Sequence, residues 1–362
     1  MNQKEQKNSL TRRKFLKWTT GGLLGAGALT LGLNSWKRTA KGTTAVTQTR
    51  PAMGTFVEIT AGGEKKKKVK NLINKAYEKI IDVDKTMSVH KDNSPVHNLN
   101  NPGNKKINLR PNTLQVLEEA QNISRLTDGS FDITSGPLLD LWGFYDGKLS
   151  VPSPDDLKQA LNLVDYQKLT LEPSSGTATL PDRNGKIDLG GIAKGYAVDK
   201  AVEVLKNGGV QSGLVNAGGD IRAFGSPEGK STWKVGLQNP LQKNDLLFGL
   251  NLFLSAITTS GNYESFFTYR GNKLAHIINP HTGWPVEDVL SVSVLTEKAI
   301  RADGLSTGAF CQEKDEALAT IEKLEDTELI YIHKSEKGKI EVEMTEGLAD
   351  RINGNRLEVQ LN

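Results

Sequence analysis

The sequence contains a single cysteine, Cys311, among its 362 residues. A disulfide within the chain needs two cysteines, and zinc or iron–sulfur sites built on cysteine need several, so both kinds of site are excluded. A lipid-modified cysteine near the N-terminus is excluded as well, because Cys311 lies far along the chain. Hydrophobic residues make up 37% and charged residues 24%. This balance is typical of a soluble globular protein and excludes a protein with many membrane spans.

Long hydrophobic runs are scarce. Residues 18–36 are uncharged, but five of them are glycine, which is unfavourable in a helix. The stretch is also slightly shorter than the roughly 20 apolar residues of a membrane-spanning helix. It follows the pair Arg12-Arg13 and so resembles a twin-arginine export signal. We expect residues 1–45 to be this signal, cleaved or kept as an N-terminal anchor, and residues 46–362 to be the folded part. The working location would then be the outer face of the cytoplasmic membrane or the periplasm.

The excess of basic charge is confined to the N-terminal region. The formal net charge of the chain is +4, yet residues 1–50 alone contain ten Lys/Arg and one Glu. The remaining residues contain 36 basic and 41 acidic side chains. A basic chain invites a nucleic acid as partner, but the folded part is mildly acidic, so we expect no nucleic-acid partner.

Helices and strands are predicted in an irregular order. Apolar residues at helical spacing predict five helices, over residues 65–83, 111–126, 193–206, 302–310 and 314–324. β-branched and alternating segments predict strands within residues 46–60, 186–190, 213–224 and 232–296, and a hairpin near the C-terminus. A loop is expected around Pro95 and Pro102. The order lacks the regular strand–helix alternation of a doubly wound protein, so it predicts an α+β fold and not a Rossmann fold.

The segment from Asp188 to Ala197 lacks the spacing of the common phosphate-binding loops, GxxxxGK[ST] and GxGxxG. It nevertheless predicts a strand that enters the turn Gly190-Gly191 and then a helix with Lys194 in its first turn. Unpaired N–H groups at a helix N-terminus favour phosphate, and a lysine adds a positive charge. A purely structural turn explains these residues equally well.

Three further segments place polar side chains in predicted loops. Residues 127–137 contain two carboxylates and suit a ligand loop, although a turn followed by a core strand also fits. Residues 216–222 contain Gly-Gly-Asp, which also fits an ordinary hairpin turn. His276 and His281 flank an Asn-Pro turn, and histidine is the side chain that most easily acts as a base near neutral pH.

Asp303 and Thr307 are four residues apart, so on a helix their side chains lie on one face. A carboxylate and a hydroxyl are the hard oxygen ligands that Mg²⁺ prefers. The alternative is that Asp303 caps a helix and Thr307 is merely exposed.

Taken in order, these segments resemble the ApbE family of FAD:protein FMN transferases over residues 46–345. The blocks that carry the resemblance are Met53-Gly54-Thr55, Met87-Ser88 with Asp92 and Ser94, residues 127–137, residues 188–196, Gly218-Gly219-Asp220, Thr259-Ser260-Gly261, residues 276–283 and residues 303–307. The resemblance implies a mixed sheet and helix fold with an elongated FAD groove. It also implies Mg²⁺-dependent transfer of FMN from FAD to a Thr or Ser hydroxyl of an acceptor protein, with release of AMP.

The resemblance further implies roles for individual residues. Those expected to contact FAD are Met53, His90, Phe131, Asp132, Ile133, Asp188, Lys194 and Ile278. Those expected to hold Mg²⁺ are Asp303 and Thr307, through their side chains, and Gly191, through its carbonyl. Asp303, Lys194 and His276 are the expected catalytic residues, with His276 as the general base or as a group that orients the acceptor hydroxyl.

The sequence departs from the family pattern at two positions. His90 stands where relatives usually have a tyrosine that stacks on the flavin, and Asn279 stands where they usually have an aspartate. Two other readings therefore stay open: an Mg²⁺-dependent FAD pyrophosphatase that yields FMN and AMP, and an exported FAD-binding protein without catalysis. For a transferase, the expected acceptor is a membrane redox subunit or an exported protein with an FMN-binding domain.

Overall fold

The structure is a computed structural model that describes residues 45–361, apart from residues 102, 104–105, 228–229, 263–265, 270–271, 336–338 and 354–359. The predicted export signal therefore lies, but for its last residue, outside the described residues. Among the residues that are described, none of the helices combines the length and the apolar character needed to cross a bilayer.

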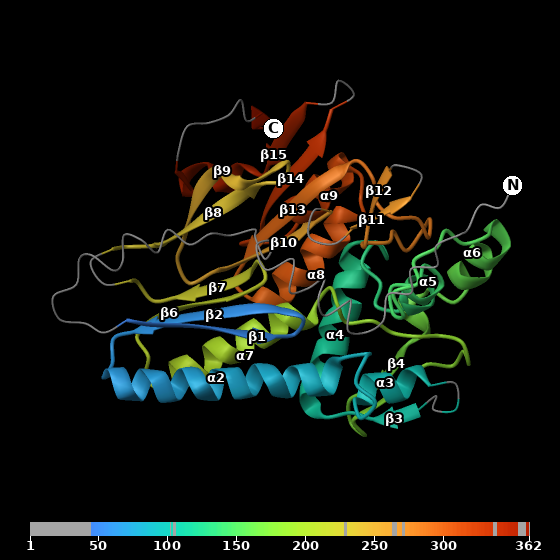
Figure 1. Cartoon of the computed structure of the whole chain (residues 1–362), viewed down its shortest axis with the longest axis horizontal. Coiled ribbons are helices and arrows are strands. Elements are labelled where there is room, and N and C mark those ends of the chain that lie inside the picture. Colours follow the sequence, from blue (N-terminus) through green and yellow to red (C-terminus); the bar gives the residue numbers. More distant parts are fainter. Residues whose placement is uncertain are drawn as a thin grey trace, which may run out of the picture.

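A nine-stranded sheet forms the centre of the molecule (Figure 1). Its strands follow the order β1-β2-β6-β7-β10-β13-β14-β15-β17. They are β1 (Val46–Ala52), β2 (Thr55–Gly62), β6 (Ser212–Ala217), β7 (Asp220–Phe224), β10 (Ala256–Gly261), β13 (Val289–Thr296), β14 (Glu328–Lys334), β15 (Ile340–Met344) and β17 (Gln360–Leu361). Neighbouring strands are antiparallel except β15 and β17. The predicted α+β class is confirmed, because a Rossmann sheet is mostly parallel.

Five helices cover one face of this sheet: α2 (Lys66–Met87), α4 (Pro111–Leu126), α7 (Ala193–Asn207), α8 (Ala299–Phe310) and α9 (Lys314–Glu322). Each lies close to its predicted range. In α2, the buried residues Val69, Ile73, Ala76 and Ile80 recur at intervals of three or four, which directs one apolar stripe to the core. The largest apolar cluster lies between these helices and the sheet.

A small sheet covers the opposite face. It consists of β8 (Trp233–Asn239), β9 (Gln242–Leu252) and β16 (Ile352–Asn353). Strand β14 shows how the central sheet is buried on both faces, since Leu329 and Tyr331 join the helix-side cluster whereas Ile330 and Ile332 join the other one. Alternate residues of a strand point to opposite faces, so β14 needs apolar side chains at both sets of positions.

Shorter elements lie beside these layers. They are α3 (Pro95–Asn100), β3 (Lys106–Asn108), α5 (Gly136–Leu141), α6 (Pro154–Leu161), η2 (Tyr166–Lys168), β4 (Thr170–Glu172), β5 (Thr177–Thr179), β11 (Phe266–Tyr269), β12 (Asn272–Ala275) and η3 (Glu346–Arg351). A third apolar cluster around Trp142 packs α5 and α6 together.

Three local predictions were wrong. Residues 186–190 form no strand but a single bridge between Lys186 and Ser135, because the Asp188 carboxylate accepts the N–H of Gly190 and turns the chain. The loop expected around Pro95 begins with helix α3, which Ser94 caps through its hydroxyl. For residues 127–137, the alternative of a turn followed by a core strand is wrong, because residues 127–135 form a loop that leads into α5.

Candidate active site

Two tight hairpin turns lie against each other at one end of the sheet. Met53 and Gly54 join β1 to β2 with φ angles of 50° and 73°, which is the mirror-image turn that hairpins favour. Gly218 and Gly219 join β6 to β7 in the same left-handed region, at 61° and 101°. A Cβ atom on Gly218 would lie 2.5 Å from the hydroxyl oxygen of Thr55. Gly218 is therefore required at this contact. The turn from β6 to β7 places Asp220, the first residue of β7, at the site.

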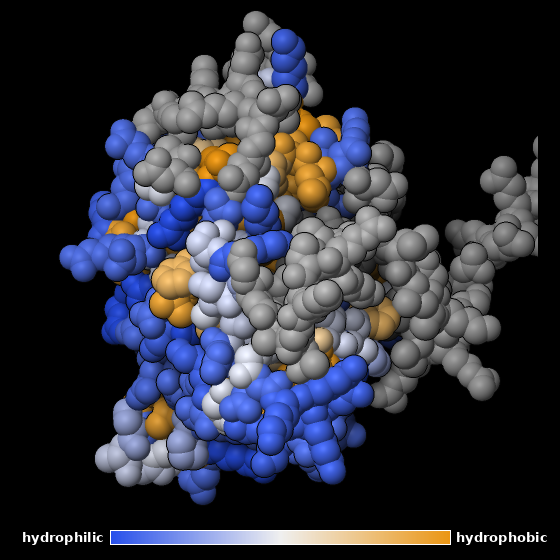
Figure 2. Space-filling view, turned by 90° about the vertical axis from the view of Figure 1, so that its left-hand side faces the viewer, coloured by the Kyte–Doolittle hydropathy of each residue, from blue (hydrophilic) through white to orange (hydrophobic). Residues whose placement is uncertain are grey.

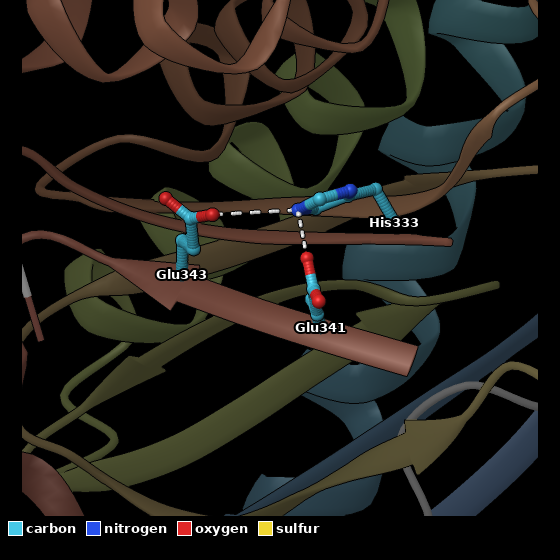
Figure 3. Close-up of side chains that lie close together, drawn as sticks. All are labelled: His333, Glu341 and Glu343. Atoms are coloured by element: carbon cyan, nitrogen blue, oxygen red, sulfur yellow. Dashed lines mark hydrogen bonds and ion pairs between the residues drawn. The ribbon is translucent and has the colours of Figure 1, made fainter. Parts of the chain in front are cut away.

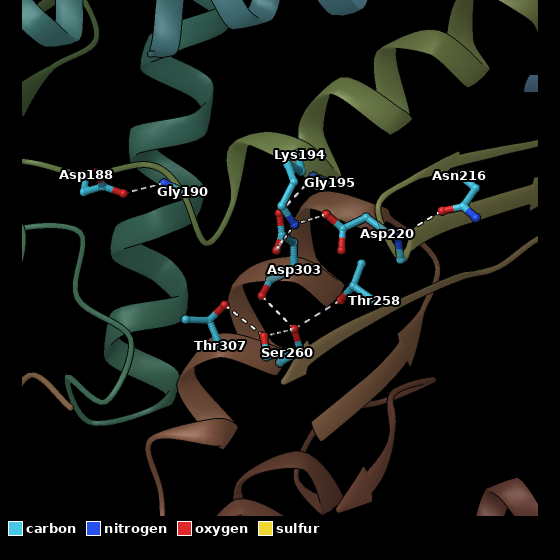
Figure 4. A network of polar contacts seen from close by, with 12 residues as sticks. Asp188, Gly190, Lys194, Gly195, Asn216, Asp220, Thr258, Ser260, Asp303 and Thr307 are labelled. Carbon is cyan, nitrogen blue, oxygen red and sulfur yellow. Dashed lines mark hydrogen bonds and ion pairs between the residues drawn. The ribbon is translucent and has the colours of Figure 1, made fainter. Parts of the chain in front are cut away.

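Lys194 links two buried carboxylates (Figure 4). Its Nζ lies 2.5 Å from Oδ2 of Asp220 and 3.9 Å from Oδ1 of Asp303. The side chains of Asp220 and Asp303 are almost fully buried, at 1% and 4% exposure, whereas that of Lys194 is 30% exposed. A buried carboxylate needs a partner of opposite charge, and Lys194 supplies one to both aspartates from the first turn of α7.

Asp303 lies inside α8, where α7 approaches most closely. Its Oδ2 accepts a hydrogen bond of 2.9 Å from the N–H of Gly195. Gly195 leaves no room for a side chain, since a Cβ atom there would lie 2.2 Å from the carbonyl oxygen of Ala299. Burial raises the pKa of Asp303 above its ordinary value, while Lys194 and the Gly195 N–H act in the lowering direction. The alternative reading of Asp303 as a helix cap is wrong, because α8 begins four residues earlier.

Asp199 on α7 caps α8 instead. Its two carboxylate oxygens accept the N–H groups of Ala299 and Ile300 at 2.9 and 3.0 Å. Arg222 on β7 donates to the same carboxylate at 2.8 Å. Burial raises the pKa of Asp199, against the lowering effect of Arg222 and the two N–H groups. This contact fixes the helix that carries Asp303 and Thr307 to the helix that carries Lys194.

Thr307 lies one turn after Asp303 and faces the Gly190-Gly191 loop. A Cβ atom on Gly191 would lie 3.0 Å from Oγ1 of Thr307, so the Gly191 backbone packs directly against that hydroxyl. Ser260 at the end of β10 contacts Thr307 at 3.2 Å through its own hydroxyl. A buried carboxylate, a hydroxyl and a backbone carbonyl are all oxygen donors, which is the set that Mg²⁺ prefers. The three residues predicted as metal ligands therefore lie on two neighbouring parts of the chain, with Asp303 and Thr307 on α8 and Gly191 in the loop before α7.

Asp188 anchors a second group of predicted residues. Its Oδ2 accepts the phenol of Tyr145 at 3.0 Å, and the Tyr145 ring meets His90 edge to face at 5.7 Å. Burial and the Asp188 charge raise the pKa of Tyr145, so its hydroxyl stays protonated and donates. The backbone N–H of Asp188 donates to the carbonyl of Ile133 at 2.7 Å. His90 is exposed, so this group lies at the surface of the site.

The segment Phe131-Asp132-Ile133 is buried. Phe131 contacts the metal-ligand region, since Cβ atoms on Gly191 and Gly308 would lie 3.2 and 3.0 Å from its side chain. The Asp132 carboxylate accepts three hydrogen bonds, two from Thr134 in its own loop and one from the N–H of Tyr166 at the start of η2. Burial raises the pKa of Asp132 despite these bonds. The carboxylate of Asp132 thus holds its own loop together.

The block from His276 to Gly283 forms a tight loop after β12. His276 is half-buried, and Ile278 is buried among Leu138, Trp142 and Leu157. Asn279 holds the turn, since its Oδ1 accepts the N–H of His281 and its Nδ2 donates to the carbonyl of Cys311. Asparagine can make both bonds where a carboxylate could only accept, so the family departure at this position has a structural role.

Contacts between the five segments bring them together. The loop 127–137 meets Asp188 and Gly191, Lys194 meets Asp220 and Asp303, and Ser260 meets Thr307. His281 reaches Ser130 at 3.4 Å. No role was predicted for Asp220, Tyr145, Ser260 or Asp199. Asp220 and Ser260 lie in blocks that carry the family resemblance and could have been found there. Tyr145 and Asp199 lie outside those blocks, and their contacts join residues far apart in the chain.

Comparisons with known proteins identify relatives of the chain. The model of the ApbE family matches residues 53–331. A protein of Haemophilus influenzae named FAD:protein FMN transferase is 34% identical over 253 residues, which is 67% of this chain and 72% of the relative. The crystal structure of the ApbE protein from Thermotoga maritima superposes with a TM-score of 0.77 at 31% identity and covers 82% of this chain and 96% of that one. The flavin transferase ApbE from Vibrio cholerae gives 0.75 at 27% identity, over 85% of this chain and 99% of that one.

Proposed function

The chain belongs to the ApbE family and is an FAD:protein FMN transferase, and we propose that it transfers FMN to a Thr or Ser hydroxyl in a Mg²⁺-dependent reaction that releases AMP. The acceptor oxygen forms a bond to the phosphorus of the FMN half. The bond from that phosphorus to the bridging oxygen of the pyrophosphate breaks, and AMP leaves with that oxygen. The hydroxyl proton passes to a base.

The observation that carries this proposal is the buried cluster of Lys194, Asp220 and Asp303 beside Thr307 and Gly191. Two almost fully buried acidic side chains meet one lysine there. A divalent cation would find the hard oxygen donors that it prefers on Asp303, Thr307 and Gly191. When bound, Mg²⁺ neutralises charge on the pyrophosphate oxygens.

The remaining residues have roles that follow from their positions. Lys194 is 30% exposed and belongs to a helix N-terminus, so it can face a phosphate group as well as Asp220. Asp188, Tyr145 and His90 form a polar and aromatic group suited to the flavin end of FAD, where the Tyr145 ring adds the aromatic surface that His90 lacks. Met53 would supply an apolar contact, and the buried side chains of Phe131, Ile133 and Ile278 would pack behind the surface that meets FAD. His276 is the candidate base for the acceptor hydroxyl.

The first experiment tests the reaction itself. Purified protein is incubated with FAD, Mg²⁺ and an acceptor domain that carries a Thr or Ser flavinylation motif, and covalent flavin is read by in-gel fluorescence. We expect a fluorescent acceptor and one AMP per FMN transferred. AMP without labelled acceptor would instead support an FAD pyrophosphatase. FAD binding without AMP would support a carrier protein.

The second experiment tests the role of Asp303. Asp303→Ala removes the only charged ligand proposed, so we expect at least a 100-fold loss of turnover at saturating Mg²⁺, on the scale of removing one charge-stabilising group. Asp155→Ala, which changes an exposed aspartate of α6, is the matched control and should retain full activity. Full activity of a folded Asp303→Ala protein would place the metal elsewhere.

We also propose that the transferase works outside the cytoplasm, with residues 1–45 as a twin-arginine signal or anchor. Its acceptor would then be a membrane redox subunit or an exported protein with an FMN-binding domain. The pair Arg12-Arg13 and the uncharged stretch after it support this proposal.

A further inference from the structure

The hairpin of β14 and β15 carries a histidine and two glutamates on one face (Figure 3). His333 pairs directly with Glu341 in the register, and Glu343 lies two residues further along β15. Alternate residues of a strand share a face, so the three side chains point to the same side. That side is the helix face, because Tyr331 on β14 reaches the carbonyl of Gln312 at the end of α8.

The ligand atoms of these residues are close enough to hold one ion. Nε2 of His333 lies 3.4 Å from Oε1 of Glu343 and 3.8 Å from Oε2 of Glu341, and one atom from each residue lies within 4.8 Å of the other two. A tetrahedral zinc ion with bonds of about 2.0–2.2 Å places its ligand atoms roughly 3.4 Å apart. The side chain of Glu341 is half exposed, so a small rotation can shorten its 3.8 Å distance from His333 to the spacing that zinc requires.

The other nitrogen of His333 provides an independent argument. Nδ1 lies 3.3 Å from the carbonyl oxygen of Lys334, which can accept a hydrogen bond from the ring N–H. The tautomer with its proton on Nδ1 directs the lone pair of Nε2 toward the two carboxylate oxygens. A carbonyl that orients the distal N–H of a histidine is also the usual outer partner of a metal ligand.

We propose that His333, Glu341 and Glu343 form a binding site for Zn²⁺, separate from the Asp303 site. One imidazole nitrogen and two carboxylate oxygens form a ligand set that suits zinc, whereas Mg²⁺ and Ca²⁺ prefer oxygen ligands alone. Three protein ligands leave a fourth position for water. His333 also lines a cavity of about 240 Å³, together with Lys314 and Tyr331, which gives that position room.

Lys314 is the competitor for this site. Its Nζ lies 2.9 Å from Oε1 of Glu343, the same oxygen that faces His333. The positive charge of Lys314 at that oxygen opposes the binding of a second cation. Zinc has to draw Glu343 away from Lys314 as it binds, and removal of the lysine charge should therefore strengthen binding.

Calorimetric titration of the full chain with ZnCl₂, in excess Mg²⁺ to fill oxygen-only sites, tests the proposal. We expect one zinc per chain and binding at least tenfold weaker in both His333→Gln and Glu341→Gln, as for the loss of a zinc ligand or its support. Lys314→Met should bind more tightly than the wild type. Glu325→Gln, which changes an exposed glutamate outside the three-residue cluster, before β14 begins, should match the wild type.

Cobalt provides a second readout that does not depend on activity. Co²⁺ in place of Zn²⁺ should give visible absorption bands in the wild type that are lost in His333→Gln. Glu341 is half exposed, so Glu341→Gln keeps the proposal testable even if the histidine variant folds poorly. Zinc binding weaker than about 100 µM in the wild type, or unchanged binding in the folded Glu341→Gln protein, would overturn the proposal.

Discussion

At the scale of single residues, Lys194 holds an unusual position between two buried aspartates. Its contact with Asp220 is short and its contact with Asp303 is longer, so the two carboxylates are not equivalent. Asp220 takes the lysine, and Asp303 keeps an oxygen directed toward it without a close bond. This asymmetry leaves Asp303, rather than Asp220, as the carboxylate that can turn to a cation.

Cys311 allows a prediction about chemical reactivity. Burial raises the pKa of its thiol to about 12, because the charged thiolate is poorly solvated there. Only the thiolate reacts with disulfide reagents, so the native protein should react with Ellman's reagent at pH 8 at least 100-fold more slowly than the denatured chain. Its rate should rise about tenfold per pH unit until the protein unfolds. Equal rates in native and denatured protein would show that the thiol is accessible.

At the scale of elements, the pairing of α7 with α8 determines the geometry of the site. The two helices can approach closely because Gly195 lacks a side chain. The direction of α8 relative to α7 is fixed because Asp199 on α7 caps α8. The two helices belong to segments about a hundred residues apart in the chain.

We predict that Asp199→Ala destabilises the protein by about 3–5 kcal/mol, the usual cost of removing one partner of a buried ion pair. The substitution leaves Arg222 without its partner and exposes the first N–H groups of α8 to an apolar environment. Urea unfolding followed by circular dichroism measures the effect. Asp155→Ala, in the first turn of the exposed helix α6, should change stability by less than 1 kcal/mol. A similar midpoint for both variants would contradict the assigned role of Asp199.

The long elements were predictable from sequence and the short ones were not. Helices α2, α4, α7, α8 and α9 each bury several apolar residues at regular spacing, so their period is visible. Helices α3, α5 and α6 have six to eight residues and bury too few of them to show a period. Strands β3, β4 and β5 have three residues each. Their pairing is set by contacts between distant segments.

The site, too, was only partly predictable from the sequence. The blocks around Asp188, Lys194, Asp303 and Thr307 could be identified from residue type and order, and the structure brings them together. The ion pair of Lys194 with Asp220 could not be predicted, because a lysine beside a glycine turn suits a phosphate equally well. The three-way contact of Asp199 was also hidden, since its partners lie on β7 and α8.

At the scale of the whole molecule, we predict that residues 1–45 direct export and that the folded part alone carries the transferase activity. Replacing Arg12 and Arg13 together by lysine should stop export if the pair is read as a twin-arginine signal, because the pathway recognises the arginines rather than their charge. Cell fractionation with an antibody to the folded part measures the distribution, and the purified variant should retain full transferase activity. Unchanged export would show that residues 1–45 do not act as this signal.

The cap that Asp199 places on α8 also concerns how the site is lost on heating. A site built on loops opens before the rest of a protein, because loops have the lowest local stability. Here Lys194 lies on α7 and Asp303 on α8, and the buried Asp199 carboxylate links these two helices, which pack on the central sheet. Separating Lys194 from Asp303 would therefore require the core to unfold. The site should persist until the core itself melts.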